Sequence, residues 1–221
     1  MMSSRKQRLL SYLVPQRIAT YDSSYNGKIE VIQSFDNYYL SAGGLMQSGA
    51  FLERVWRVGL QKLKLTSQPV SSALLLGLAG GSMVQVLTRL HPEVNITAVD
   101  IDPVIVQAGK DYLGLIESEH FHIQIADAAK FVNQALVTTI RYDLIFVDLY
   151  RGHKIAAFIE SEQFLNSLYK LLFPGGILIF NRLYFQKYKS EADNFLDKIS
   201  SFFQDVRKAR SYSNLLIAIR K

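Results

Sequence analysis

The amino-acid sequence predicts an α/β fold, a Rossmann-like sandwich with a mostly parallel sheet and an antiparallel edge. Three observations predict it. From Ala73 onward, apolar runs alternate regularly with segments of helical periodicity. The run Leu-Ile-Phe-Val at 144–147 is apolar throughout, which is typical of a strand buried on both faces. The run at 73–76 ends in a turn of small residues at 77–82, as in a βαβ unit that holds a nucleotide.

The region after residue 72 supplies the elements of this sandwich. The expected strands are Ala73–Leu78, Asn95–Asp100, His122–Ala126, Tyr142–Asp148 and Gly176–Asn181. The expected helices are Met83–Leu90, Val104–Tyr112, Ala128–Ala135, Glu162–Leu172 and Lys189–Phe203. A last strand, Asn214–Ile219, follows a short polar turn and is expected to close the sheet as its antiparallel edge.

The region before residue 69 predicts a smaller unit. The runs 28–33 and 38–42 are β-rich and are separated by Asp-Asn, which is turn chemistry, so they predict a hairpin. Residues 45–65 carry apolar side chains at helical spacing. We expect two domains, a hairpin-and-helix region at 1–68 and a ligand-binding domain at 69–221. The hairpin and the helix face between Phe51 and Leu63 form a candidate surface for pairing two subunits in a homodimer.

Composition narrows the class of protein. The chain has 221 residues, 49% of them hydrophobic, and a net charge of +6. Basic residues gather at the two ends without interleaved aromatics, which favours a solvated surface over a nucleic-acid footprint and leaves an anionic partner open. The absence of cysteine excludes disulfides and thiolate ligands and fits a reducing cytoplasm. No apolar run is long enough for a membrane span, and the basic, briefly apolar N-terminus does not predict a signal peptide.

The turn after the first strand and the end of the second predict a nucleoside site. Gly77, Ala79 and Gly81 let the backbone turn tightly and approach a ligand closely. Asp100 ends the next strand about 20 residues later, where a carboxylate can accept hydrogen bonds from ribose hydroxyls. Ile101 follows it at the same edge. The chain is therefore predicted to bind a nucleoside-containing ligand.

Two further acids follow strands at this edge. Asp127 either caps the helix that begins at Ala128 or contacts adenine, and both interpretations stay open. Asp148 ends a buried strand with no cation adjacent until Arg151, so it is expected to face the site. Tyr150, beside Asp148, is expected to shape the pocket there.

Other polar residues carry a weaker signal. Asp102, before a proline, is expected to be a helix N-cap, and Ser82 can cap the helix that follows the glycine turn. His120 and His122 lack a third ligand of suitable type, so no metal site is predicted. His153 lies close after the last strand acid, which makes a general-base role a minor hypothesis.

Six segments resemble the spermidine synthase-like proteins within the class I S-adenosylmethionine methyltransferase fold. The segment LLLGLAGGS (74–82) is similar to the family's glycine turn, and AVDIDPVI (98–105) to its ribose-binding strand end. ADAAKFV (126–132) is similar to the family's adenine-side segment, and RYDLIFVDLY (141–150) to its catalytic strand. FPGGILI (173–179) is similar to the helix–strand junction that follows, and YLSAGGLMQS (39–48) to the N-terminal hairpin.

The resemblance implies a cofactor and site roles. The cofactor is S-adenosylmethionine or its decarboxylated form. The resemblance also implies that Gln47 borders the pocket and that Gly77–Gly81 support the methionine-derived end of the cofactor. Asp100 would bind the ribose, and Asp127 and Ala128 would bind the adenine. Asp148 would be the acid nearest the reacting centre.

Three departures from the family bear on the substrate. Aminopropyltransferases carry an aspartate inside the glycine turn, where this chain has Gly80. Their catalytic strand has a second acid, where this chain has Arg151. The acidic stretch after the hairpin glutamine is reduced here to Phe51 and Glu53. Because polyamines are multiply cationic and need carboxylates to replace lost hydration, these departures weaken the prediction of polyamine synthesis.

The leading hypothesis is therefore an S-adenosylmethionine-binding transferase that methylates an unidentified small acceptor. Aminopropyl transfer from the decarboxylated cofactor to a small amine is the first alternative, and a non-catalytic nucleoside-binding or interaction module is the second. A nicotinamide-dependent oxidoreductase is disfavoured because Ser82 stands where the dinucleotide fingerprint places glycine or alanine.

Overall fold

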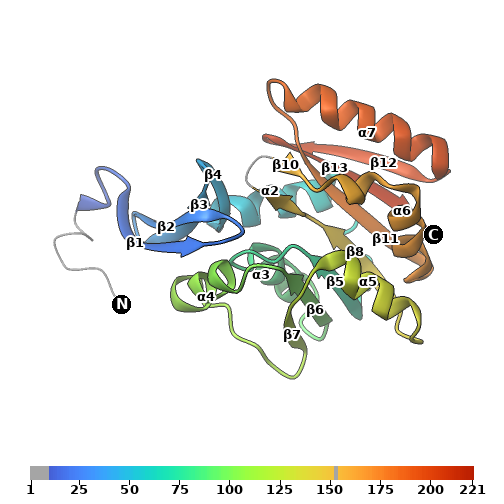
Figure 1. The fold of residues 1–221 in the computed structure, drawn as a ribbon, viewed down its shortest axis with the longest axis horizontal. Helices are drawn as coiled ribbons and strands as arrows, with labels where there is room; N and C mark the ends of the chain where they lie inside the picture. The colour runs from blue at the N-terminus through green and yellow to red at the C-terminus, as the bar shows by residue number, and fades with distance from the viewer. Residues whose placement is uncertain (1–9, 152–153) are drawn as a thin grey trace.

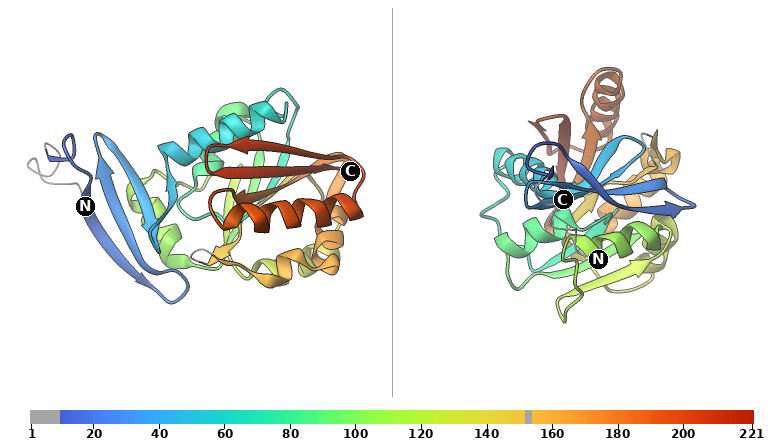
Figure 2. Two further views of the ribbon diagram at one scale, coloured as in Figure 1. Left: turned by 90° about the horizontal axis from the view of Figure 1, so that it is seen from above. Right: turned by 90° about the vertical axis from the view of Figure 1, so that its left-hand side faces the viewer.

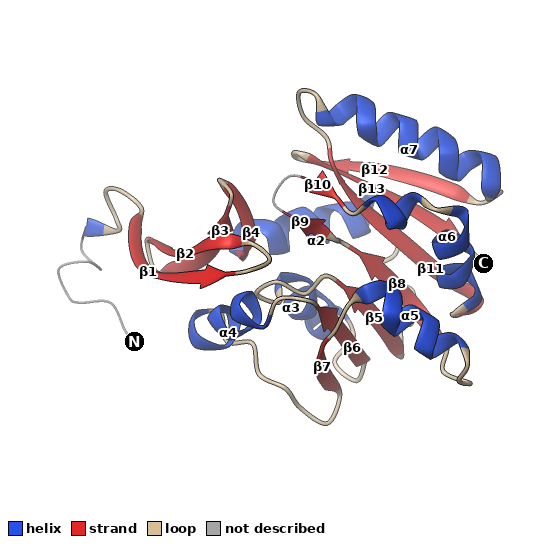
Figure 3. Ribbon diagram, viewed as in Figure 1, coloured by secondary structure: helices blue, strands red, loops and turns tan. Residues whose placement is uncertain are grey.

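A seven-stranded sheet forms the centre of the molecule. The structure, a computed structural model, describes residues 10–151 and 154–221. The strand order is β12-β13-β11-β8-β5-β6-β7 (Figures 1 and 3). All neighbours from β7 to β11 are parallel, and β13 is antiparallel to both β11 and β12. The strands are β5 Ser72–Leu76, β6 Asn95–Asp100, β7 Phe121–Ile125, β8 Tyr142–Val147, β11 Leu172–Leu183, β12 Val206–Ser211 and β13 Asn214–Arg220.

Helices cover both faces of this sheet, because its strands are apolar on both sides. The helices are α2 Ala50–Lys62, α3 Ser82–Leu90, α4 Pro103–Tyr112, α5 Ala128–Leu136, α6 Glu162–Lys170 and α7 Tyr188–Phe202. One core contains residues of α2, α3 and α4, and the other contains residues of α5, α6 and α7. A short segment, β9 Tyr150–Arg151, β10 Lys154–Ile155 and the 3-10 helix η1 Ala157–Glu160, joins β8 to α6. The expected Rossmann-like class I methyltransferase sandwich is confirmed.

A second, antiparallel sheet precedes the sandwich and extends from one end of it (Figure 2). Its order is β1-β2-β3-β4, with β1 Gln16–Ser23, β2 Gly27–Ser34, β3 Asn37–Ala42 and β4 Leu45–Gly49. One face packs on α4 through Ile29 and Val31, which are fully buried. Tyr21 also donates a hydrogen bond to Asp111 of α4 at 2.8 Å, so the sheet is fixed to the sandwich by apolar and polar contacts.

The structure differs from the sequence prediction at the edge of each sheet. The N-terminal hairpin is a four-stranded sheet, because β1 and β4 flank the two predicted strands. The antiparallel strand β13 is not the outer edge, since β12 lies outside it. β12 carries Arg207, Lys208 and Arg210 over its two faces, and only Ala209 and Ser211 are buried, so its sequence lacks the apolar signal of a strand.

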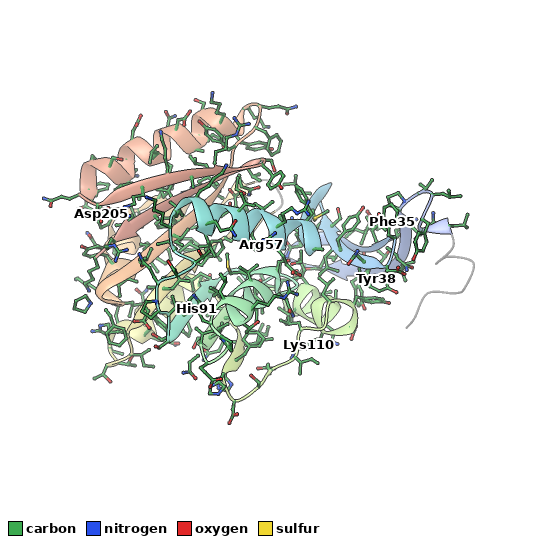
Figure 4. The ribbon with its side chains drawn as sticks, turned by 180° about the vertical axis from the view of Figure 1, so that it is seen from behind. Phe35, Tyr38, Arg57, His91, Lys110 and Asp205 are labelled. Carbon is green, nitrogen blue, oxygen red and sulfur yellow. The ribbon has the colours of Figure 1, made fainter. Side chains whose placement is uncertain are left out.

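Helix α2 lies across the sandwich, with its apolar face turned inward. Val55, Trp56 and Leu60 are buried in the same core as α3 and the sheet. The helix face that the sequence offered as a subunit surface is therefore largely covered within the chain itself. Arg57 lies on the outer side of α2, away from the sheet (Figure 4). Among the described helices, none combines the length and apolarity needed to cross a membrane.

Candidate functional site

A cavity of about 280 Å³ opens beyond the carboxyl ends of the parallel strands. Its wall combines the glycine turn after β5, the ends of β6 and β8, the loop after β7, and β4 of the N-terminal sheet. The sequence-predicted residues that line it are Gln47, Gly77, Ala79, Asp100, Ile101, Asp127, Ala128, Asp148 and Tyr150. Gly81 does not line it, and a side chain there would meet Leu115 at 2.5 Å. The acids of distant segments thus converge on one cleft.

The glycine turn is locked by hydrogen bonds at each of its N–H groups. Gly77 N–H donates to the Val99 carbonyl at 2.9 Å, and Gly81 N–H donates to the Leu78 carbonyl at 2.9 Å. Gly80 N–H donates to Ser48 Oγ at 2.7 Å. The two intervening N–H groups donate to Asp100, described next. The turn therefore has no unpaired N–H with which to cradle a phosphate.

Asp100 clamps this turn from the end of β6. Its Oδ2 accepts hydrogen bonds from Leu78 N–H at 2.9 Å and Ala79 N–H at 2.8 Å, and its Oδ1 accepts one from Asp102 N–H at 2.9 Å. Burial raises the pKa of the carboxyl, and the three N–H donors oppose that rise. Because each carboxylate oxygen can accept about two hydrogen bonds, Oδ1 keeps capacity for a ligand hydroxyl.

Two buried serines tie the N-terminal sheet to the glycine turn. Ser48 of β4 accepts from Gly80 N–H, and Ser82 Oγ accepts from Gly49 N–H at 2.8 Å. The expectation that Ser82 is an N-cap is wrong, because Gly81 occupies the N-cap position in the left-handed conformation and Ser82 is the first residue of α3. Its hydroxyl instead accepts the hydrogen bond from Gly49 N–H, which links the end of β4 in the N-terminal sheet to the start of α3.

The start of α3 is consequently uncapped. Within the described residues no side chain accepts a hydrogen bond from its first N–H groups. The first two residues of the helix, Ser82 and Met83, both line the cavity. Free N–H groups and the helix dipole give this end a partial positive charge, so the cavity has one wall that favours an anionic group.

The other two acids that the sequence placed at helix starts do act as caps. Asp102 Oδ1 accepts from Val104 N–H at 2.9 Å, with Pro103 at the first position of α4, which confirms the prediction. Asp127 Oδ1 accepts from Lys130 N–H at 2.9 Å at the start of α5. Asp127 also lines the cavity, so its two proposed roles are compatible.

Asp148 lines the cleft, and its backbone packs against Gly77. A Cβ added at Gly77 would come within 2.2 Å of the Asp148 carbonyl oxygen, so only glycine fits there. Asp148 Oδ1 accepts a hydrogen bond from Asn181 Nδ2 at 2.7 Å. Burial raises the Asp148 pKa to about 6, with a smaller rise from Asp100, while the Asn181 donor and Arg182 oppose it. A carboxyl with this pKa can hold or release a proton near neutral pH.

Tyr150 lines the cavity with its ring, but its hydroxyl is bound to the backbone of β11. The hydroxyl accepts from Leu183 N–H at 2.9 Å and contacts the Asn181 carbonyl at 3.4 Å. Its phenol pKa is raised by burial and by Asp148. This geometry fits the expected shaping role and gives the hydroxyl no free position for proton transfer.

Sequence reasoning missed a buried arginine and the apolar floor of the cavity. Arg182 is 2% exposed, lies 3.5 Å from the Phe195 ring centroid and has Nη2 3.2 Å from Glu160. The contact with Glu160 is an ion pair without hydrogen-bond geometry, so Nε and Nη2 have no hydrogen-bond acceptor among the described residues, and burial lowers the pKa of the guanidinium. Trp56 and Phe146, with rings 5.4 Å apart, form the floor. Their helical and strand spacing predicted core positions only.

The positions where the chain departs from aminopropyltransferases remain without cavity acids. A Cβ at Gly80 would lie 2.7 Å from Leu113 Cδ1 and 2.8 Å from Leu40 Cδ1, so an aspartate there would require both leucine side chains to move. Glu53 pairs with Arg89 at 2.5 Å and does not line the cavity. The Arg151 side chain and the whole of His153, with its suggested general-base role, lie outside the described residues.

Comparison with known proteins agrees with this architecture. The spermine/spermidine synthase domain family matches residues 53–215. The polyamine aminopropyltransferase of Vibrio vulnificus is 29% identical over 131 residues, which is 59% of this chain and 44% of that protein. The chain thus spans about half the length of this relative.

Two solved structures share the fold. A probable spermidine synthase from Corynebacterium glutamicum superposes with a TM-score of 0.75 at 18% identity, over 93% of this chain and 80% of that one. Human methyltransferase-like protein 13 in complex with SAH superposes with a TM-score of 0.61 at 22% identity, over 77% of this chain and 79% of that one. Because the family match covers most of the chain, this protein belongs to the spermine/spermidine synthase domain family.

Proposed function

We propose that the protein is an S-adenosylmethionine-dependent transferase that methylates a small acceptor, with Asp148 as the acid that orients the acceptor or removes its proton. The observation that carries this proposal is the charge pattern at the methionine end of the cleft. There the start of α3 is uncapped and no acid stands in the glycine turn.

The positive end of α3 distinguishes the two candidate cofactors. S-adenosylmethionine carries an α-carboxylate, which a helix N-terminus stabilises. The decarboxylated form carries only an ammonium group at that end, which the same helix end repels. The aminopropyltransferase aspartate that would neutralise the ammonium is replaced by Gly80, whose Cβ direction is filled by Leu40 and Leu113.

The part of the cleft that would hold the acceptor also favours methyl transfer from S-adenosylmethionine over aminopropyl transfer. Asp148 is the one titratable acid among the described cavity residues there, since Asp100 and Asp127 stand at the ribose and adenine positions. A diamine acceptor carries a second, protonated amine beside the reacting one, and burying that ammonium group needs a carboxylate or other strong acceptors of its own. With one carboxylate and an aromatic floor, the cleft fits an acceptor that carries a single nucleophilic centre.

The residues of this chain would divide the work as follows. Asp100 holds the ribose with the free capacity of Oδ1, while Ile101, Leu149 and Ala128 supply apolar walls for the base. When bound, the cofactor supplies a methyl carbon already activated by its sulfonium. Positioning therefore carries most of the catalysis, with Asp148 accepting the acceptor's proton.

Aminopropyl transfer remains the second candidate. The specific observation in its favour is the similarity to the polyamine aminopropyltransferase of Vibrio vulnificus, together with three carboxylates and no described cation in the cavity wall. An assay with putrescine and the decarboxylated cofactor tests it directly. An aminopropylated product would make this the function.

The proposal is tested by calorimetric titration with two ligands that differ only in the carboxylate. We expect S-adenosylmethionine to bind about fivefold more tightly than its decarboxylated form, because the two ligands differ by one carboxylate and the helix end stabilises that carboxylate by roughly 1 kcal/mol. Tighter binding of the decarboxylated form would contradict the proposal. In the same assay Asp148→Asn should retain cofactor binding and lose transfer.

A further inference from the structure

Asp148 is the inner end of a buried chain of side-chain amides. Asn181 of β11 donates from Nδ2 to Asp148 Oδ1 at 2.7 Å, and Asn214 of β13 donates from Nδ2 to Asn181 Oδ1 at 2.9 Å. Asn181 is 5% exposed and Asn214 is 4% exposed. At the outer end of the chain, Ser213 Oγ donates a hydrogen bond to Asn214 Oδ1 at 3.2 Å. The chain crosses three neighbouring strands at the rim that carries the cavity.

The chain fixes which end of the Asn181 amide faces the carboxylate. An asparagine amide can present either its NH2 or its oxygen to a neighbour, and the rest of the network decides between them. Asn214 occupies the Asn181 oxygen with a donor, so only the Asn181 NH2 is left for Asp148. A donor toward the carboxyl stabilises its anionic form, whereas an acceptor would stabilise the protonated form.

We propose that Asn181 and Asn214 are positioning residues, through which the C-terminal β12–β13 hairpin sets the orientation and the proton affinity of Asp148. The inference deepens the proposed function, because it rests on Asp148 being the proton acceptor. Asn214 does not line the cavity. Its influence on the site passes through Asn181.

Other charged groups also face Asp148, and the proposal separates their effect from that of the amides. Asp100 on β6 raises the Asp148 pKa, and Arg182 on β11 lowers it. Tyr150 on β9 is a neutral phenol near pH 7, and burial raises its pKa further above the ordinary value. None of these three accepts a hydrogen bond from Asn214, so uncharged substitutions at Asn214 leave them in place.

The test is the Asp148 pKa, measured by carbon-13 NMR titration of the protein without ligand. Asn181→Leu removes the donor and should raise the pKa by about one pH unit or more, a tenfold change in proton affinity. Asn214→Leu should raise it in the same direction, because Asn181 is then free to turn its oxygen toward Asp148. Asn194→Leu, at an exposed asparagine of α7 outside the chain of amides, is the matched control and should leave the pKa unchanged.

A second variant guards against loss of folding. Asn214→Ala removes the donor without adding bulk or charge, so Asn181 can again turn its oxygen toward Asp148 and the Asp148 pKa should rise. An unchanged pKa in folded Asn214→Leu and Asn214→Ala would overturn the proposal. Failure of the proposed function looks different: the titrations shift as expected but no S-adenosylmethionine binds. Where transfer is detected, the acid limb of its pH profile should move with the measured pKa.

Discussion

Asp148 combines a functional position with a cost in stability. Its folded-state pKa of about 6 lies above the ordinary value of 3.8. Between these values the folded protein holds a proton that the unfolded chain has released, so this carboxyl makes the fold less stable as pH rises from about 4 to 6. Asn181 moderates the loss by donating to the anion, but burial outweighs it.

We therefore expect Asp148→Asn to stabilise the protein at pH 8 by about 1–3 kcal/mol and to have little effect at pH 4. The neutral amide keeps an oxygen for the Asn181 donor and carries no charge. Urea unfolding at the two pH values measures the difference. An equal change at both would show that the Asp148 pKa is not raised.

Asp100 serves the backbone as well as any ligand, since it accepts from three N–H groups. Asp100→Ala should weaken S-adenosylhomocysteine binding by a factor of about 10–100 and also lower the melting temperature, because buried N–H groups lose their acceptor. Calorimetry and thermal unfolding measure the two effects. Asp197→Ala, on the exposed side of α7, is the control. Unchanged affinity in folded Asp100→Ala would exclude a ribose role.

At the scale of elements, the glycine turn is the part with the least tolerance. Gly77 has φ +91° and a Cβ there would meet the Asp148 carbonyl at 2.2 Å. Gly77→Ala should therefore cost about 3 kcal/mol or more and displace the strand end that carries Asp148. Gly114, with φ +67° and no atom within 4 Å of an added Cβ, is the matched control.

Gly114→Ala should cost only the backbone strain, about 1–2 kcal/mol, and leave ligand binding intact. Chemical denaturation of both variants compares them. Equal losses would mean that positive φ alone, rather than the contact with Asp148, explains the need for glycine at residue 77.

The sequence predicted the central strands to within a few residues at most ends, since buried parallel strands are apolar on both faces and are unambiguous. It did not predict β1, β4 or β12. β4 is short and lies within a helical pattern of apolar spacing, and β12 is an edge strand whose four exposed or half-exposed residues hide its period. The position of β13 inside the sheet depends on which strands it pairs with, and the hydrophobic pattern of a single strand does not specify its partners.

The candidate site was predictable where it consists of acids at strand ends, since the carboxyl ends of parallel strands share one edge. Asn181 and Asn214 were missed because a neutral amide at the end of a strand is common and does not by itself indicate a functional contact. The signal that could have found them is an asparagine at either end of a run buried on both faces, where it must find a partner. Arg182 carried a similar signal, a cation in the same buried run.

On the scale of the whole molecule, the two sheets share one core. Ile29, Val31 and Leu40 of the N-terminal sheet belong to the same cluster as Val84 of α3 and Ile105 of α4. The proposed division at residue 68 therefore separates segments of sequence that are packed together. Such continuity favours cooperative unfolding of both parts.

We expect a single transition in differential scanning calorimetry. Leu40→Ala, which removes a fully buried side chain that backs the glycine turn, should lower that one transition by an amount equivalent to about 2–5 kcal/mol. Loss of stability confined to an early, separate transition would show that the N-terminal sheet unfolds independently.

The chain contains one tryptophan, Trp56, and that residue forms part of the cavity floor against Phe146. Its indole is almost entirely shielded from water. The fluorescence of this one tryptophan should therefore respond to a ligand that enters the cavity in which transfer is proposed to take place. Collections of unlabelled cofactors and acceptors can be screened by intrinsic emission alone, with no engineered dye and before any product has been identified.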